Sequence, residues 1–389
     1  MKTADPEFMR AINRFHVMDA IRRFGPISRV EIAERTELSP TTVSAITAAL
    51  IDDKLIMPHA IGAVRDAARG RPRVMLELNP DAAFVVGVKL APDRITVAVT
   101  NFRADVLNTL FLPVRVDRQP AAVIADLVED GVRRCIADAG LPIEKISGVC
   151  IGLPGIVETT SGRCRQSPVF RERDVPFSSE MAARLGVDTT TDSDANLVTL
   201  AEHWFGHGRG LDDFLVVSIE DSLGLGIMHN GELFRGAGGL SPDLGDFLVR
   251  PPNGHNTPTR LKDIIGEAIA EEGRWNRSAA LNLNDEALRT IGDAIGFAIA
   301  DLITLFAPPK VVLAGSLLSA GDRLLGPLME AVQRFTPPGL ADVSEIVVRD
   351  WGDEIWARGA AAMALRELYR APWSTTGPAR PQQQSQTAP

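Results

Sequence analysis

Apolar residues near the N-terminus recur at helical spacing in two short segments that a polar turn separates. In residues 28–36 the predicted inward positions are Val30, Ile32 and Ala33, and in residues 40–52 they are Val43, Ile46, Leu50 and Ile51. The residues between the segments, Glu37 and Leu38, predict a tight turn. The pattern therefore predicts two short helices in close succession.

Capping residues support both helices. Ser28 can cap the first helix, and Glu31 three residues later completes a capping box. Ser39 can cap the second helix, and Pro40 then takes the first helical position, where its missing N–H costs nothing. Two helices joined in this way over residues 25–57 are typical of a helix-turn-helix, so DNA is the first partner to consider. The alternative is a small helical bundle with a polar surface.

The second helix has a polar face suited to a DNA groove. Its predicted exposed positions are Thr41, Thr42, Ser44, Ala45 and Thr47. Small hydroxyl and methyl groups of this kind can approach base edges or phosphates closely in a major groove. The predicted DNA contacts are Ser28, Arg29, Ser39, Thr41, Thr42, Ser44, Thr47, Arg69, Arg71 and Arg73.

The last three of these contacts belong to a basic segment, residues 67–73, that follows the helices. It separates the short apolar segment 55–57 from the strand-like segment 74–78, which predicts the wing of a winged helix. The alternative is a solvated linker. Residues 1–73 contain 12 Lys and Arg against 9 Asp and Glu, for a net charge of +3, whereas the rest of the chain has a net charge of −12. This distribution favours a DNA-facing N-terminus and an acidic remainder.

From residue 80 onward the pattern changes to alternating strands and helices. Residues 83–114 predict a meander, residues 120–140 an amphipathic helix, and residues 146–157 a buried strand that ends in a turn with glycine and proline. A second round follows, with strands around a glycine-rich turn in residues 214–234, a long buried helix at 286–306 and a buried strand at 310–318. Two similar α/β units predict two lobes with a cleft between them.

Length and composition set the domain count and compartment. A chain of 389 residues with 45% hydrophobic content can bury more than one core. We predict a DNA-binding domain over 1–79, a two-lobed domain over 80–370 and a disordered tail over 371–389, which is rich in Pro, Gln, Ser and Thr. No apolar run is long enough to span a membrane and no signal peptide is evident, which predicts a cytoplasmic protein. The three scattered cysteines indicate neither disulfides nor a zinc site.

Several segments, in the right order, resemble one known family. They include NRFHVMDAIRRFGPISRVEIAERTELSPTTVS, RGRPRVMLELNP, GVCIGLPGIV, DSDANLVTLAEHWFG, LGLGIMHNGELFRGAGG and PPKVVLAGSLLSAGDRLLGPLMEAV. Over about residues 9–369 the chain resembles the ROK family of repressors and sugar kinases, in its repressor branch. The resemblance implies an α/β fold in which a winged helix-turn-helix precedes a two-lobed, actin-like (ribonuclease H-like) sugar-kinase domain.

The segments that hold ATP in the family's kinases are altered in this chain. The first phosphate hairpin, a glycine-containing loop in the kinases, reads Lys89-Leu90-Ala91-Pro92-Asp93. Proline removes a backbone donor and Asp93 adds a negative charge where phosphates would lie. The second phosphate turn reads Glu220-Asp221-Ser222, whose two carboxylates would repel a triphosphate. We therefore expect no ATP cofactor and no kinase activity.

The family's zinc element is also missing. Residues 240–266 contain no cysteine, and Asp246 stands where the resemblance implies a metal-ligand histidine. His255 alone cannot form a site that needs about four ligands, and we interpret it as a surface loop residue. We expect no bound metal.

Part of the family's sugar cleft remains. The resemblance places the kinase's general base at Asp194, within the tetrad Ser193-Asp194-Ala195-Asn196. In the kinases a Glu-x-Gly-His segment contacts the sugar, and here it reads Asp243-Leu244-Gly245-Asp246. Asp263 lies near the expected position of a further sugar-binding carboxylate. The predicted effector contacts are Ser193, Asp194, Asn196, Asp243, Asp246 and Asp263. The alternative role for Asp194 is to cap the helix that follows it, and the two roles could coexist.

These features predict a DNA-binding transcriptional regulator, a repressor, that a sugar-like effector controls. A homodimer or homotetramer would present its recognition helices to half-sites of a double-stranded operator, and ligand binding in the cleft would change their spacing. One alternative is a sugar kinase of the family with a DNA-binding extension. Another is a DNA-binding oligomer whose second domain binds no ligand.

Overall fold

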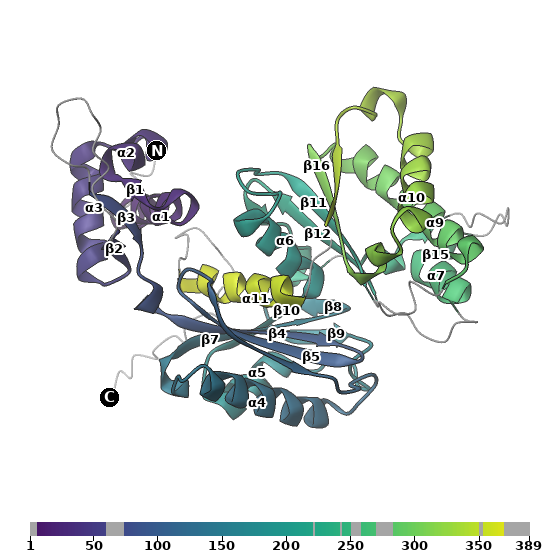
Figure 1. Cartoon of the computed structure of the whole chain (residues 1–389), viewed down its shortest axis with the longest axis horizontal. Coiled ribbons are helices and arrows are strands. Elements are labelled where there is room, and N and C mark those ends of the chain that lie inside the picture. The colour runs from purple at the N-terminus through teal and green to yellow at the C-terminus, as the bar shows by residue number, and fades with distance from the viewer. Residues whose placement is uncertain are drawn as a thin grey trace, which may run out of the picture.

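The computed structural model in Figure 1 contains a small N-terminal domain followed by two α/β lobes. The residues that the structure describes are 6–59, 74–220, 222–241, 243–249, 258–269, 283–349 and 353–368. Within them, no helix is both long enough and apolar enough to cross a membrane. The predicted tail, residues 371–389, lies outside the described residues.

The N-terminal domain contains three helices and a small sheet. The helices are α1 (Pro6–Phe24), α2 (Arg29–Thr36) and α3 (Pro40–Asp52), and the strands β1 (Ile27–Ser28), β2 (Ile56–Pro58) and β3 (Met75–Leu78) pair in the order β1-β3-β2. Both predicted caps are present: Ser28 and Glu31 form a capping box, and the Ser39 side chain accepts from the Thr42 N–H. Glu37, in the left-handed region with φ 56°, makes the predicted turn.

Apolar side chains of all three helices meet in the core of this domain. Ile21, Ile32, Val43 and Leu50 are almost completely buried there. One predicted inward residue, Val30, is instead 50% exposed. It lies two residues before Ile32, and positions two apart on a helix point about 200° apart, so only one of them can face the core.

The first lobe is built on a mixed five-stranded sheet. Strands β4 (Phe84–Ala91), β5 (Arg94–Asn101), β6 (Val106–Leu112), β7 (Ile146–Leu153) and β10 (Thr189–Ser193) pair in the order β10-β7-β4-β5-β6. The meander β4-β5-β6 is antiparallel, whereas β4, β7 and β10 run parallel, as expected when helices connect them. Helices α4 (Ala121–Asp138) and α5 (Phe177–Leu185) cover one face. The hairpin β8 (Ile156–Glu158) and β9 (Arg163–Gln166) follows β7.

The second lobe repeats this plan. Strands β11 (Phe214–Ile219), β12 (Leu223–His229), β13 (Glu232–Leu233), β16 (Lys310–Ala314) and β17 (Glu345–Arg349) pair in the order β13-β12-β11-β16-β17. Helix α6 (Asp194–Phe205) packs on one face, and α7 (Leu261–Ile269), α9 (Asp285–Phe306) and α10 (Asp322–Phe335) pack on the other. A small hairpin, β14 (Leu248–Val249) and β15 (Thr259–Arg260), precedes α7.

The last helix, α11 (Asp353–Leu368), joins the two lobes. It lies between the first sheet and α6 (Figure 1), and a side chain at Gly359 would collide with the backbone of Leu197 in α6. The two helices therefore pack with their backbones in close contact. One hydrophobic cluster runs through this junction and continues into the N-terminal domain, so the three units share a core.

Candidate functional site

The second helix of the helix-turn-helix, α3, presents a polar surface at its N-terminal end. Ser39, Thr41 and Ser44 are exposed and Thr42 is partly exposed. The Ser39 and Thr42 hydroxyls lie 2.8 Å apart, so both belong to the cap of the helix. This arrangement provides small polar side chains at a helix N-terminus, where DNA-binding helices of this kind meet base edges and phosphates.

Two predicted DNA contacts are buried. Ser28 is 2% exposed, and its hydroxyl lies 2.6 Å from the Glu31 carboxylate as part of the capping box. Thr47 is fully buried because it lies four residues after Val43 and three before Leu50, on the inward face of α3. The prediction that Thr47 lies on the exposed face is therefore wrong. Its hydroxyl accepts from Arg29 Nε at 2.8 Å, which ties α2 to α3.

The strands on either side of the predicted wing are present. β2 and β3 pair antiparallel, with Ile56 opposite Leu78 and Pro58 opposite Leu76. They are the strands that a wing would join. Arg69, Arg71 and Arg73 lie outside the described residues, so their role in DNA binding stays a prediction.

A pocket of about 550 Å³ lies between the two lobes. The first lobe contributes Arg118, which precedes α4, Gly155, which lies between β7 and β8, Ile156, which begins β8, and residues of the 166–173 segment. The second lobe contributes Ser222, Leu223, Asp243, Gly245 and Lys262. Gly155 has a φ of 108°, and a Cβ there would lie 2.2 Å from the Gln166 carbonyl oxygen. Only glycine fits this position, where the backbone forms the wall of the pocket.

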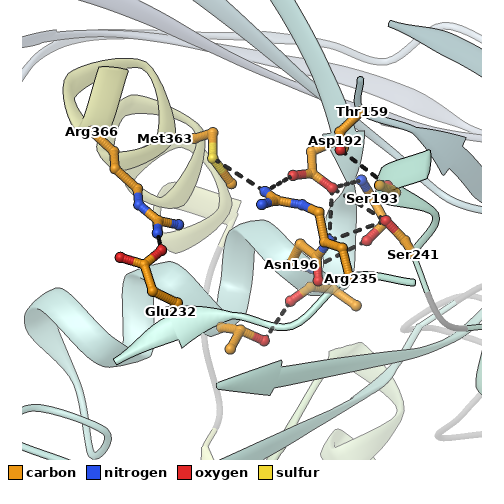
Figure 2. Close-up of polar contacts among 12 residues, drawn as sticks. Thr159, Asp192, Ser193, Asn196, Glu232, Arg235, Ser241, Met363 and Arg366 are labelled. Atoms are coloured by element: carbon orange, nitrogen blue, oxygen red, sulfur yellow. Dashed lines mark hydrogen bonds and ion pairs between the residues drawn. The ribbon is translucent and has the colours of Figure 1, made fainter. Parts of the chain in front are cut away.

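Two predicted effector contacts, Ser193 and Asn196, instead belong to a buried polar network (Figure 2). Asn196 is fully buried, and its side-chain amide donates to Asp192 at 2.7 Å and to Ser241 at 3.0 Å. The Ser193 hydroxyl caps α6 through the Asn196 N–H. Asp192 also pairs with Arg235 at 2.5 Å. Neither Ser193 nor Asn196 lines the pocket, and this network uses the NH2 group of the Asn196 amide and the Ser193 hydroxyl.

Asp194 is the first residue of α6, so Ser193 rather than Asp194 is the cap. The Asp194 side chain is 6% exposed and accepts from the Ala195 N–H at 2.8 Å. Burial raises the pKa of Asp194 to about 6, against an opposing effect of Lys89. The nearby carboxylates of Glu220 and Asp243 raise it further. Asp194 is therefore a carboxyl group that can change its protonation state near neutral pH.

The other three predicted carboxylates have different surroundings. Asp243 lines the pocket, and burial together with Asp246 raises its pKa. Asp246 turns away and pairs with Lys262 at 2.6 Å and Arg260 at 2.9 Å, which lowers its pKa. Asp263 is exposed on α7 and is not among the pocket residues. Of the six predicted effector contacts, only Asp243 lines this pocket. Asp194 is close enough to Asp243 for the two carboxyl groups to interact electrostatically.

A buried ionic cluster joins the lobes where the altered loops meet. The Glu220 carboxylate lies 3.7 Å from Lys89 Nζ and 3.6 Å from Arg94 Nη2, both of which belong to the β4-β5 hairpin. It also accepts from the backbone and hydroxyl of Ser316 at 3.1 and 3.2 Å. Lys89 Nζ lies 3.8 Å from the centre of the Trp356 ring. The Glu220 carboxylate is thus held by two cations of the β4-β5 hairpin and by the backbone N–H of Ser316.

A second contact, which the sequence did not indicate, joins the N-terminal domain to α6. The Arg22 guanidinium carbon lies 4.2 Å from the centre of the Trp204 ring, and Arg209 donates to the carbonyl of Arg23. His203 lies in the same region, where burial and the two α1 arginines lower its pKa to about 3. Helix α6 therefore begins beside the pocket at Asp194 and ends against the N-terminal domain.

No group of three or more potential metal ligands occurs among the described residues. The three cysteines are buried and separate from one another, and burial raises the pKa of Cys135 to about 11 and that of Cys164 to about 12. Thiols of this kind are core residues rather than metal ligands or nucleophiles. His255 lies outside the described residues.

Curated proteins with similar sequences are regulators. The chain is 25% identical to the DNA-binding transcriptional dual regulator NagC of Escherichia coli, over 93% of this chain and 94% of that protein. It is 23% identical to the xylose repressor of Caldicellulosiruptor bescii, over 94% of this chain and 98% of that protein.

Solved structures share the fold. A ROK family transcriptional regulator, described as a homologue of the E. coli MLC protein, superposes with a TM-score of 0.76 at 23% identity, over 94% of this chain and 98% of its own. A ROK family glucokinase from Streptomyces griseus, in complex with glucose and AMPPNP, superposes with a TM-score of 0.61 at 19% identity, over 72% of this chain and 99% of its own. Residues 85–259 and 257–367 match the ROK family, and residues 10–57 match a winged helix-turn-helix DNA-binding domain. The chain therefore belongs to the ROK family and carries an N-terminal winged helix-turn-helix followed by a two-lobed, actin-like ROK domain.

Proposed function

We propose that this protein is a transcriptional repressor whose winged helix binds double-stranded operator DNA and whose ROK domain binds a sugar-like effector. The regulators that resemble it over nearly their whole length support this function. We further propose that it acts as a homodimer or homotetramer, because two recognition helices one helical turn of DNA apart read a two-fold operator.

The course of helix α6 is the observation that carries the proposal. Its first turn packs against β12, where a Cβ at Gly224 would lie 2.6 Å from Ala195 Cβ, and the preceding residue, Leu223, lines the pocket. Its twelve residues span about 18 Å. Its last turn holds Trp204 against Arg22 of the DNA-binding domain. A ligand that moves the pocket wall would therefore act on the DNA-binding domain through one rigid element.

We also propose that the protein does not phosphorylate its effector. Glu220 places a carboxylate among Lys89, Arg94 and the Ser316 N–H, at the junction of the two altered phosphate loops. The cations that could neutralise a nucleotide phosphate at this point are thus already neutralised by the protein. A triphosphate would have to displace Glu220 and leave its charge buried, which is strongly unfavourable.

A ligand panel tests this function. DNA fragments that bind the protein are first selected from a random library. Binding is then measured with glucose, xylose, N-acetylglucosamine and their phosphate esters, and each sugar is also mixed with ATP to test for phosphorylation. The proposal predicts that one sugar changes DNA affinity and that none is phosphorylated. Turnover of ATP would identify a kinase, and DNA binding that no sugar changes would identify a ligand-free oligomer.

A further inference from the structure

The arginines at the pocket mouth lack the ion pairs that most other arginines make within the described part of the chain. Elsewhere in the described part of the chain, arginines such as Arg103, Arg165 and Arg334 pair with carboxylates. Arg118, Arg171 and Arg173 line the pocket and have no ion pair among the described residues. Unpaired cations that gather at a pocket of an acidic protein raise the local concentration of anions.

Backbone hydrogen bonds hold two of these arginines next to each other. The Arg118 N–H donates to the Pro168 carbonyl at 3.0 Å, and the Arg171 N–H donates to the Gln119 carbonyl at 2.9 Å. Gln119 and Phe170 form a parallel bridge between them. Arg118 has a φ of 49°, in the left-handed region that non-glycine residues rarely adopt. The fold therefore holds the backbones of Arg118 and Arg171 close together at one edge of the pocket, where both side chains are exposed.

The acidic residues at the pocket do not neutralise this edge. Glu172 lies between Arg171 and Arg173 in sequence, but its carboxylate accepts from the Ala121 N–H at 3.0 Å and so caps the N-terminus of α4. Asp243 belongs to the opposite lobe, and burial raises its pKa. Lys262, the fourth cation of the lining, is paired with Asp246.

We propose that the effector is an anionic sugar, whose phosphate or carboxylate binds to Arg118 and Arg171 while its ring lies toward Ile156, Leu223 and Asp243. Guanidinium groups bind phosphates and carboxylates in a bidentate manner, and an aspartate accepts hydrogen bonds from sugar hydroxyls. The inference rests on the proposed function, because it assigns a ligand class to the same pocket. It does not follow from the kinase cleft, since Arg118 and Arg171 lie outside the predicted effector contacts.

Calorimetric titration of the full-length protein tests the inference. The probes are glucose, N-acetylglucosamine, their 6-phosphates, glucuronate and inorganic phosphate. We expect one anionic sugar to bind at least ten-fold more tightly than its neutral parent, and inorganic phosphate alone to bind more weakly than that sugar. Phosphate esters and glucuronate separate the two possible anions. Arg118→Gln and Arg171→Gln should each weaken the anionic sugar at least ten-fold and leave binding of a neutral sugar within two-fold.

Arg134→Gln is the matched control, because Arg134 is an exposed arginine on α4 that pairs with Asp130 and does not line the pocket. It should leave every affinity unchanged. The inference is overturned if a neutral sugar binds as tightly as its anionic form, or if the two pocket variants weaken neutral and anionic sugars equally. Failure of all sugars to bind would overturn the proposed function as well, whereas binding of neutral sugars alone would overturn only the anionic assignment.

Discussion

Arg22 of α1 stacks on Trp204 of α6, and this pair connects the DNA-binding domain to the helix that begins beside the interlobe pocket. Arg22 also pairs with Asp19 at 2.7 Å, which holds its guanidinium in place. Burial alone would raise the pKa of Asp19, but the two neighbouring arginines outweigh it and keep the pKa below its usual value. Asp19 therefore holds the Arg22 side of this contact in place.

Replacing Arg22 should separate ligand binding from DNA release. We expect Arg22→Leu to bind both DNA and sugar within a few-fold of wild type, but to show a smaller change of DNA affinity on sugar binding. The reason is that coupling between sites needs a contact that differs between the two states. Arg35→Leu is the control, because Arg35 makes the same kind of contact with Phe24 inside the DNA-binding domain. Fluorescence anisotropy of labelled DNA measures both variants, and a normal sugar response in Arg22→Leu would exclude this contact as the coupling route.

The exposed residues of α3 should determine sequence preference. We expect Thr41→Ala to reduce discrimination at one base pair by about 1 to 3 kcal/mol, because Thr41 lies exposed at the N-terminal end of the helix. Thr47→Ala should instead lower stability, since Thr47 is buried and bonded to Arg29. Competition binding against a library of single base-pair changes measures the first effect. Unchanged preferences in Thr41→Ala would show that α3 does not read the operator.

The predicted wing should contribute affinity rather than sequence preference. We expect Arg69→Gln, Arg71→Gln and Arg73→Gln each to weaken binding to all DNA sequences by a similar factor. Each substitution should also reduce the dependence of log affinity on log salt by about one, because one phosphate contact is lost. Titrations at several salt concentrations measure this slope. A slope equal to that of wild type would mean that the segment is a solvated linker.

Asp194 should make stability depend on pH. Because the folded-state pKa is raised to about 6, the protonated form stabilises the fold fully below pH 4, and this stabilisation is lost as the pH rises through 6. Asp194→Asn should therefore exceed wild type in stability at pH 7.5 by up to about 3 kcal/mol, and the difference should vanish toward pH 4. Urea unfolding at several pH values measures it. A difference that does not change with pH would contradict a raised pKa at Asp194.

Glu220 should stabilise the junction of the lobes. We expect Glu220→Gln to lower the free energy of unfolding by up to about 3 to 5 kcal/mol, because it removes a buried carboxylate from the neighbourhood of Lys89 and Arg94, of which Arg94 keeps its ion pair with Asp93. Asp130→Asn breaks an exposed pair on α4 and should cost less than about 1 kcal/mol. Chemical denaturation compares the two. Equal, small losses would mean that the cluster contributes little to stability.

Local signals explain why the helix-turn-helix was predictable. Its caps lie within three residues of their partners, so Ser28, Glu31 and Ser39 indicate the helices from sequence alone. The polarity of Thr47 predicts an exposed position, but its spacing from Val43 and Leu50 places it on the buried face of α3. Periodicity also predicted the meander β4-β5-β6, α4 and β7 in the first lobe and β11, β12, α9 and β16 in the second, because each of these elements carries its own apolar pattern. It did not predict β10, α5, α10, β17 or α11.

The arrangement of the candidate site depends on contacts between residues that are far apart in the sequence. The spacing of apolar residues does not predict such contacts. Asn196 was predicted to face a ligand, but Ser241, which lies 45 residues farther along, binds its side chain. Arg118 and Arg171 become neighbours only through backbone bonds between two loops. The Arg22 and Trp204 contact likewise joins segments far apart in sequence. Such pairings follow from the packing of the whole chain.

Reciprocal linkage between sugar and DNA is the most direct test of a ligand-controlled regulator. The dissociation constant of selected DNA is measured with and without a saturating concentration of the tightest-binding sugar, and the dissociation constant of that sugar is measured with and without saturating DNA. A ligand-controlled repressor predicts that both constants rise by the same factor, since the coupling free energy is shared. A sugar that binds the interlobe pocket but leaves the DNA dissociation constant unchanged would contradict it.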